Sequence, residues 1–413
     1  MIAGFTSPTG SRSFFGSLVL GAYNAQGKFI FCGKVGTGFT DSTLKKIHSK
    51  LEALTTDEHP FDSKPPDVKS TKWVQPKLVA EIEFTEWTDQ GRLRHPVFKG
   101  LRTDKHAEEV YKELEEPIEK VTTPKQEKSK AVKLTSLKKM MYPEDKISKG
   151  DIYNYYLAVA SFILPFIQNR LLTLVRCPSH YQECFYQKHW NQSTANTLLS
   201  FPIKNKEKKT ENYLYLTDQN GLFGLVQMGV LEIHPWGSTI NHIELPDIIV
   251  FDLDPSPELL WEKTVQAAME IKQFLEALDL RSFIKNTGGK GLHVVVPIEP
   301  KYDWDVIKRF SELFVKFVEK QNPENYITNM SKSKRKGKIY LDYLRNQRNA
   351  TAISAYSTRA RAGAPIATPL HWDELTNNIK DTFYTIHTLP KRLSNLKKDP
   401  WEDFWDLKQE LKF

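Results

Sequence analysis

The sequence predicts two domains, a small strand-rich domain followed by a larger domain that mixes strands and helices. In residues 14–34, apolar and polar residues alternate in two runs around Asn24–Gly27, which is the pattern of a β-hairpin. In the second half, two long amphipathic helical patterns lie between strand-like runs, which is typical of an α/β sheet domain. Residues 103–130 are rich in charge and poor in apolar side chains, which predicts a solvated linker. We place the domains at residues 1–108 and 131–413, and the linker at 109–130.

Further elements follow from the spacing of apolar residues. Residues 43–54 place four of them on one face of a short helix, residues 61–70 form a loop, and residues 77–87 are strand-like. A helix at residues 150–169 opens the second domain. The two amphipathic patterns predict helices whose apolar faces belong to the core: Trp261, Val265, Ala268, Leu275 and Leu278 in the first, and Ile307, Phe310, Phe314 and Phe317 in the second.

The bulk composition is compatible with nucleic-acid binding but does not prove it. The net charge is +8 and the isoelectric point is about 9.0, which suits a protein that neutralises phosphates but also simple solubility. Cys32, Cys177 and Cys184 form no C-x-x-C pair and no disulfide framework, which indicates a reducing cytoplasm. We found no apolar run of membrane length and therefore expect a cytoplasmic protein without a membrane partner.

Two carboxylates end an apolar, strand-like run. Asp252 and Asp254 follow Ile248–Phe251, and side chains two positions apart on a strand share one face. Such close like charges repel unless a cation lies between them, so the pair predicts a divalent ion and phosphate chemistry. The alternative is a strand that ends in solvated acids.

Two downstream motifs favour the first interpretation. Asn286–His293 contains three glycines, Lys290 and His293, which suit a triphosphate, although a hairpin turn with an incidental lysine is the alternative. Asp342 lies inside another apolar run, where an unpaired carboxylate would be costly. It is predicted as a third metal ligand, or as the partner of Arg345 or Arg348 in a salt bridge.

Five motifs in one order resemble those of a known family. They are His234–Gly237, Phe251–Pro255, Thr287–Val294, Tyr340–Asn346 and Tyr356–Arg361. This series resembles the polymerase domain of bacterial DNA ligase D, in the archaeo-eukaryotic primase superfamily, over residues 131–390. The resemblance implies a primase-type α/β fold around a sheet like that of the RNA-recognition motif (RRM).

The N-terminal part resembles a different domain. Ser7–Arg12, Gly33–Phe39, Val79–Phe84 and Arg94–Arg102 look like the oligonucleotide-binding (OB) domain of an ATP-dependent ligase, with Arg94 as a DNA contact. A ligase also needs a nucleophilic lysine in a Lys-x-Asp/Asn-Gly motif, which the sequence lacks. We therefore expect no ligase activity from this chain alone, whether the adenylation domain is encoded separately or was lost through a misplaced start.

The resemblance also implies site residues. Asp252, Asp254 and Asp342 would be catalytic and would hold two Mn²⁺ or Mg²⁺ ions, one activating the primer 3′-hydroxyl and one neutralising pyrophosphate. The implied nucleotide contacts are His234, Thr287, Gly288, Lys290, Arg345 and Arg359. For His234, a packed core histidine is the alternative.

The DNA contacts rest on looser matches. Phe185 and Tyr186 match an aromatic pair that packs against template bases, although the family usually has two phenylalanines. Lys139 and Lys149 match residues that bind a downstream 5′-phosphate, although Lys138 replaces the usual aspartate before the first of them. The alternatives are core aromatics and ordinary surface lysines.

Two functions remain open at this stage. The first is a metal-dependent, template-directed nucleotidyltransferase that fills gaps or extends ends in non-homologous end joining. The resemblance implies DNA ends, gapped DNA with a 5′-phosphate, nucleoside triphosphates and a Ku homodimer as partners, a preference for ribonucleotides and manganese, and a place at the nucleoid. The second is a DNA-binding accessory part of a split or truncated ATP-dependent DNA ligase, working with a separately encoded nucleotidyltransferase domain.

Overall fold

The chain divides into two compact units. The computed structural model describes residues 1–8, 14–24, 26–66, 70–84, 87–88, 90–102, 110, 132–191, 194–204, 210–375 and 384–412. The first unit is Met1–Glu127 with Glu183–Phe185, and the second is Lys128–Gln182 with Tyr186–Phe413. Apart from Val110, the predicted linker lies outside the described residues, as does most of the Ser7–Arg12 motif, so the domain boundaries remain predictions.

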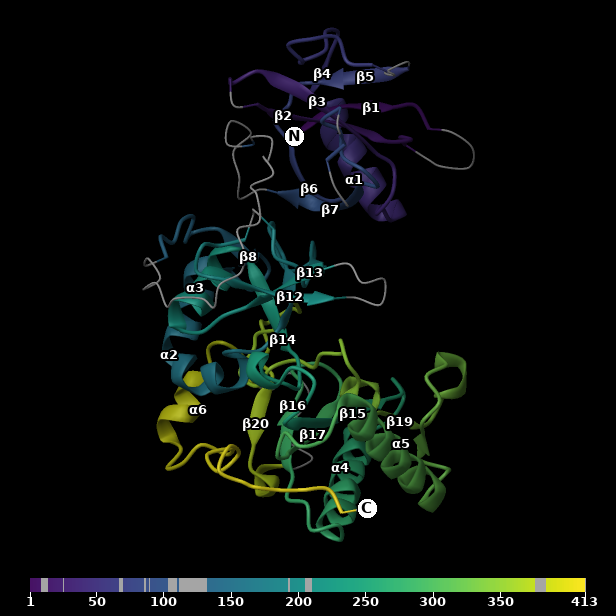
Figure 1. The fold of residues 1–413 in the computed structure, drawn as a ribbon, viewed down its shortest axis with the longest axis vertical. Helices are drawn as coiled ribbons and strands as arrows, with labels where there is room; N and C mark the ends of the chain where they lie inside the picture. Colours follow the sequence, from purple (N-terminus) through teal and green to yellow (C-terminus); the bar gives the residue numbers. More distant parts are fainter. Residues whose placement is uncertain are drawn as a thin grey trace. The chain divides into compact units, whose positions relative to one another are not determined.

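The first unit is built on an antiparallel sheet in the order β3-β2-β1-β5-β4 (Figure 1). The predicted hairpin is the pair β2–β3, and the predicted helix is α1, with Leu44, Ile47 and Leu51 buried. A separate pair, β6–β7, contains the strand predicted at 77–87. The elements are β1 (Ile2–Thr6), β2 (Leu18–Tyr23), β3 (Phe29–Val35), α1 (Asp41–Glu52), β4 (Thr55–Thr56), β5 (Thr71–Val74), β6 (Val79–Glu83) and β7 (Val97–Arg102).

The second unit contains a hairpin, a five-stranded sheet and a six-stranded sheet. The hairpin β8–β9 leads into α2, which begins at a capping box between Ser148 and Asp151. Strands β11, β10, β13 and β12 follow one another in the five-stranded sheet, and β14 also pairs with β10. The elements are β8 (Met140–Tyr142), β9 (Ile147–Ser148), α2 (Lys149–Ile167), β10 (Leu172–Arg176), β11 (Phe185–Gln187), β12 (Leu199–Lys204), β13 (Thr210–Tyr215), α3 (Gln219–Gln227) and β14 (Val230–Pro235).

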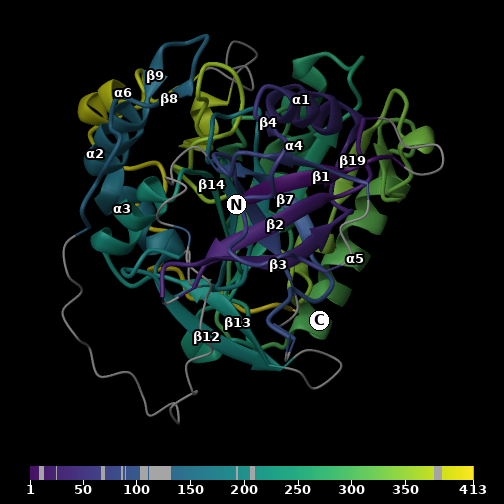
Figure 2. The same ribbon diagram turned by 90° about the horizontal axis from the view of Figure 1, so that it is seen from above.

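The six-stranded sheet has the order β18-β19-β15-β17-β16-β20. Apart from the two-residue strand β18 before β19, the order β15-α4-β16-β17-α5-β19 along the chain is a β-α-β-β-α-β series, which is the arrangement of an RRM-like sheet. Helix α2 contacts α3 and α6 (Figure 2). The remaining elements are β15 (Ile248–Pro255), α4 (Trp261–Glu276), β16 (Phe283–Asn286), β17 (Leu292–Pro297), α5 (Trp304–Gln321), β18 (Tyr326–Ile327), β19 (Ile339–Asp342), β20 (Thr368–Leu370) and α6 (Leu389–Asn395).

Helices α4 and α5 cover one face of this sheet and leave the other for polar side chains. On β15, Ile249, Phe251 and Leu253 are buried in the core beneath the helices. The intervening side chains, which include Asp252 and Asp254, point to the opposite face because side chains alternate along a strand. The fold positions the site through this alternation.

The structure confirms the predicted fold class and corrects some details. The predicted apolar faces of α4 and α5 are mostly buried. Leu278, however, lies beyond the end of α4 and is 36% exposed, and Phe317 is 47% exposed. Cys177 and Cys184 are disulfide-bonded, contrary to the expectation that the cysteines form no disulfide framework, whereas Cys32 is free and buried. Among the described residues, no helix is both long and apolar enough to cross a membrane.

Candidate active site

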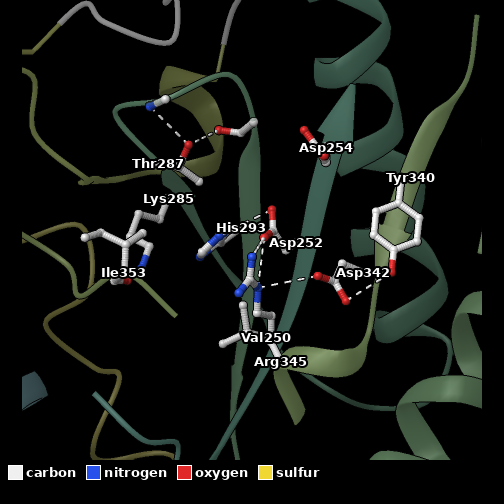
Figure 3. A network of polar contacts seen from close by, with 12 residues as sticks. Val250, Asp252, Asp254, Lys285, Thr287, His293, Tyr340, Asp342, Arg345 and Ile353 are labelled. Carbon is white, nitrogen blue, oxygen red and sulfur yellow. Dashed lines mark hydrogen bonds and ion pairs between the residues drawn. The ribbon is translucent and has the colours of Figure 1, made fainter. Parts of the chain in front are cut away.

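Strand register assembles a row of four ionisable side chains across the open face of the six-stranded sheet. Asp342 on β19 pairs with Asp252 on β15, Asp252 pairs with His293 on β17, and His293 pairs with Lys285 on β16. Residues paired across neighbouring strands place their side chains on the same face. Figure 3 shows this row, with Asp254 one step further along β15.

Asp252 is the most strongly held carboxylate of the row. Its Oδ2 accepts a hydrogen bond from Nε of Arg345 at 3.2 Å, and its Oδ1 lies 3.4 Å from Nε2 of His293 (Figure 3). Burial opposes ionisation, but His293 and Arg345 hold the pKa of Asp252 well below its usual range. This carboxylate is therefore ionised at neutral pH.

The two other carboxylates have pKa values shifted upward. Burial, followed by repulsion from Asp252, raises the pKa of Asp254, although Arg335 lies 3.1 Å away. Burial also raises the pKa of Asp342, against the attraction of Arg345 at 3.5 Å. A further cation near either carboxylate would stabilise its ionised form.

Arg345 joins two of the three acids. The predicted alternative for Asp342, a salt bridge to Arg345, is thus present, whereas Arg348 pairs with Glu244 at 2.8 Å. As the side chains stand, no group of three or more His, Cys, Asp and Glu residues in the described ranges is arranged to hold a metal ion. Asp252, Asp254 and Asp342 share one face of the sheet, but their role as metal ligands remains a prediction.

The glycine-rich segment is the turn between β16 and β17. Thr287 closes it, because its Oγ1 donates to the carbonyl of Gly291 at 2.9 Å and accepts from the amide of Gly289 at 3.2 Å. Gly288 has a φ of +63°, and a Cβ there would lie 2.8 Å from the carbonyl carbon of Ile366. Lys290 is exposed at the tip of the turn. Only glycine tolerates both conditions. The segment is thus the hairpin turn that the sequence offered as the alternative, and its binding of a triphosphate remains a prediction.

A pocket of about 420 Å³ opens beside the row. Such a volume suits a nucleotide-sized ligand. Gly288 is buried in the turn behind it, beside Ile366. The predicted site residues that line the pocket are His234, Asp252, Asp254, Thr287, Lys290, Asp342, Arg345 and Arg359.

Glu232 is a residue of this site that the sequence analysis missed. Its side chain is buried on β14, where Oε2 lies 2.9 Å from Nε2 of His234 and Oε1 accepts from Nε of Arg359 at 3.0 Å. Burial opposes its ionisation, yet the hydrogen bond from His234 and the charge of Arg359 lower its pKa to about 2. Arg359 also donates to the carbonyl of Thr287 at 2.8 Å. Glu232 thus connects three motifs that are far apart in the sequence.

Arg335, Arg361 and Lys285 were missed as well. The two arginines line the pocket, and Lys285 completes the row. The spacing of Glu232 and His234, two positions apart on a strand, was the one available signal for Glu232. Arg361 ends the Tyr356–Arg361 motif, whereas no local pattern separates Arg335 and Lys285 from surface charge.

The predicted DNA contacts are in mixed environments. Tyr186 is 71% exposed, as a stacking residue should be, whereas Phe185 is buried, which matches the core alternative. The main-chain amide of Lys149 donates to the carbonyl of Lys139 at 2.8 Å, so the hairpin brings the two residues together. The Lys149 ammonium is buried, however, and donates to the carbonyl of Gln227 at 2.9 Å, while that of Lys139 donates to the carbonyl of Pro178. Arg94 is exposed between β6 and β7.

An RRM-like sheet that carries three aspartates on one face, beside a nucleotide-sized pocket, is the arrangement of a primase-type polymerase. The family model for the LigD primase-polymerase domain matches residues 148–401, and the model for the ATP dependent DNA ligase C terminal region matches residues 11–105. Since the first match covers more than half of the sequence, the chain belongs to the LigD primase-polymerase family.

Individual relatives agree with this assignment. The multifunctional non-homologous end joining protein LigD of Pseudomonas aeruginosa is 33% identical over 424 residues, which cover 100% of this chain and 50% of that protein. The bifunctional LigD of Bacillus subtilis is 30% identical over 278 residues, covering 66% and 44%. The chain thus spans about half the length of these relatives or less.

A solved structure shares the fold. The polymerase domain of Mycobacterium tuberculosis ligase D, in complex with DNA, matches with a TM-score of 0.62 and 24% identity, over 67% of this chain and 99% of that one. This likeness concerns the fold alone.

Proposed function

We propose that the chain is a metal-dependent, template-directed nucleotidyltransferase that fills gaps or extends DNA ends in non-homologous end joining. One observation carries the proposal: Asp252, Asp254 and Asp342 share one face of the sheet at the edge of a pocket that cationic side chains also line. The two relatives described above are named as non-homologous end joining proteins, which supports the same activity.

The donor set suits hard divalent ions. Carboxylate oxygens are the ligands that Mg²⁺ and Mn²⁺ prefer. Burial raises the pKa of Asp254 and of Asp342, and a bound cation would favour their ionised forms. Asp252, Asp254 and Asp342 would hold two such ions, which would activate the primer 3′-hydroxyl and neutralise pyrophosphate. Arg345 and Arg335 would have to turn away from the carboxylates to admit them.

The remaining residues would bind and orient the nucleotide. Lys290 and Arg359 line the pocket and present positive charge to phosphate oxygens, whereas His234 also lines it but has its Nε2 engaged by Glu232. Arg359 is held in place by Glu232 and by the Thr287 carbonyl, so its guanidinium is pre-oriented. Tyr186 is exposed and available to stack on a template base.

The test is primer extension with Mn²⁺ and nucleoside triphosphates. Asp252→Asn and Asp254→Asn should each lower the rate at least about a hundredfold, because removing one electrostatic stabiliser of a transition state has effects of that size. DNA affinity should persist in both variants. Asp305→Asn, at an exposed position on α5, is the matched control. Extension by Asp252→Asn at the wild-type rate would refute the assignment.

A second role rests on the first unit, which matches the ligase C-terminal region. It would hold DNA for a separately encoded ligase nucleotidyltransferase domain, and the same complex would include a Ku homodimer at the nucleoid. With labelled ATP alone, the chain should neither become adenylylated nor seal a nick, since it has no Lys-x-Asp/Asn-Gly motif. Adding such a domain should restore sealing. A covalent label on this chain would contradict the expectation.

A further inference from the structure

Lys285 is a buried cation at the end of the ionisable row. Its side chain points away from the helices, on the same face as Asp252 and His293 (Figure 3). Lys285 is only 4% exposed, and burial lowers the pKa of its ammonium to about 7, against the attraction of Asp252. Within the described residues, no carboxylate lies at ion-pairing distance from it. A buried charge without such a partner is costly, so its presence calls for a reason.

The contacts of this ammonium identify what it holds. Nζ donates to the main-chain carbonyl of Ile353 (Figure 3). It also lies 6.0 Å from the centre of the Trp401 ring. Ile353 belongs to residues 351–355, which we call the wall segment. Two positions earlier, the carbonyl of Thr351 accepts from Nη1 of Arg345 at 3.4 Å. Two cations from the site therefore hold two carbonyls of one short segment.

The wall segment separates two cavities. Ala352 and Ile353 line the nucleotide-sized pocket, and they also line a second cavity of about 50 Å³ that Lys285 faces. The second cavity is too small for a nucleotide. It nevertheless leaves space behind the wall segment, so packing alone does not fix the position of the wall segment. The hydrogen bond from Lys285 supplies part of the missing restraint.

The wall segment also provides apolar surface in a pocket that charged side chains line. Phosphates would be drawn to the cationic lining, whereas Ala352 and Ile353 offer an apolar surface that suits the base or the sugar. On the other side, the amide of Ser354 donates to the carbonyl of Ile233 at 2.9 Å, which joins the segment to the strand that carries His234.

We propose that Lys285 is a positioning residue, which holds the wall segment through the Ile353 carbonyl so that Ile353 packs against the sugar or base of the bound nucleotide. This inference rests on the proposed function, since it assumes that the pocket takes a nucleotide. It predicts that loss of the ammonium weakens nucleotide binding without weakening DNA binding.

The experiment measures binding without turnover. Calorimetry would follow ATP binding to the full chain with Mn²⁺ and a primer–template whose primer lacks a 3′-hydroxyl. Lys285→Met, which has similar volume and no donor, should raise the Kd for ATP about tenfold, the usual effect of losing a hydrogen bond from a charged group. Lys316→Met, at an exposed position on α5, is the control and should leave the Kd unchanged. DNA affinity should be the same in all three proteins.

A double-mutant cycle separates positioning from general damage. Ile353→Ala should weaken ATP binding by a similar factor, and the double variant should be little worse than either single variant, because both remove the same contact. Multiplicative effects, an unchanged Kd in Lys285→Met, or an equal loss of DNA affinity would overturn the inference. If wild-type protein binds no ATP, the proposed function fails first. If wild-type protein binds ATP but does not extend primers, only the proposed chemistry fails.

Discussion

At the scale of single residues, Glu232 connects predicted site residues that lie far apart in the sequence. Both of its oxygens are used, by His234 on one side and by Arg359 and the amide of Ala360 on the other. A carboxylate in this position fixes the orientation of two groups that we assign to nucleotide binding. It does so without touching the pocket itself, as Glu232 is not among the lining residues.

Glu232→Gln should therefore raise the KM for nucleotide, on the order of tenfold for one charge-assisted contact, with a smaller effect on kcat. The amide keeps the shape but presents an NH₂ group to His234 or to Arg359, each of which is a donor to the carboxylate. Steady-state kinetics checks this. Glu244→Gln, at an exposed partner of Arg348, is the control. Equal KM values in wild type and Glu232→Gln would contradict the role.

The lowered pKa of Glu232 also predicts a pH dependence of stability. The pKa falls from 4.5 to about 2 on folding, so the unfolded chain binds the proton more readily. The stabilisation by the ionised carboxylate is complete above about pH 4.5 and is lost as the pH falls toward 2. The difference in unfolding free energy between wild type and Glu232→Gln should shrink over this range in urea titrations. A constant difference would argue against an ionised Glu232.

At the scale of elements, the turn between β16 and β17 combines two demands on one glycine. Gly288→Ala would meet left-handed strain and a Cβ that lies 2.8 Å from the Ile366 carbonyl carbon. Gly337→Ala has a similar φ of +72° with open space around the Cβ, so it isolates the strain. We expect Gly337→Ala to lower the free energy of unfolding by about 1–2 kcal/mol. Gly288→Ala should lower it by about 1–3 kcal/mol more. Equal melting temperatures of the two variants would show that the contact relaxes freely.

The sequence predicts elements well where their pattern is local. Helices α1 and α2 follow from apolar spacing, and Asp252 and Asp254 follow from strand alternation. The turn at Gly288 was foreseen only as the alternative to a triphosphate-binding segment. The pairing of Asp342 with Asp252 joins strands that are distant in the sequence, and it was inferred only from the cost of burying an acid and from the family motif. Lys285 was not predicted because no local pattern marks a lysine that ends beneath a distant wall segment.

At the scale of the whole molecule, the proposed binding of DNA by a chain of net charge +8 should depend on salt concentration. If the hairpin β8–β9 binds a downstream 5′-phosphate, gapped DNA that carries this phosphate should bind more tightly than DNA with a 5′-hydroxyl. Each phosphate contact should add about 0.7–0.9 to the magnitude of the salt slope. Lys139→Ala should abolish the difference, and Lys133→Ala, an exposed neighbour, should not.

Lys149 is less suited to this test than the sequence implies. Its ammonium is buried against Gln227, with hydrogen bonds at 2.9 and 3.0 Å, so Lys149→Ala should cost stability as well as affinity. Fluorescence titrations at several salt concentrations with both DNAs would measure the slope. Equal affinity of wild type for the two DNAs would show that these lysines do not recognise the phosphate.

The register of the six-stranded sheet has a consequence for how the protein acquires its site. A slip of one residue between β15 and β19 would turn Asp342 toward α4 and α5 and bring Leu341 or Tyr343 to the open face. A slipped register therefore removes Asp342 from the site, and the site is complete only after β19 has paired with β15. Because this pairing closes a long loop, it belongs to the slow, non-local steps of folding. In a refolding experiment, the recovery of nucleotide binding would mark the docking of this strand.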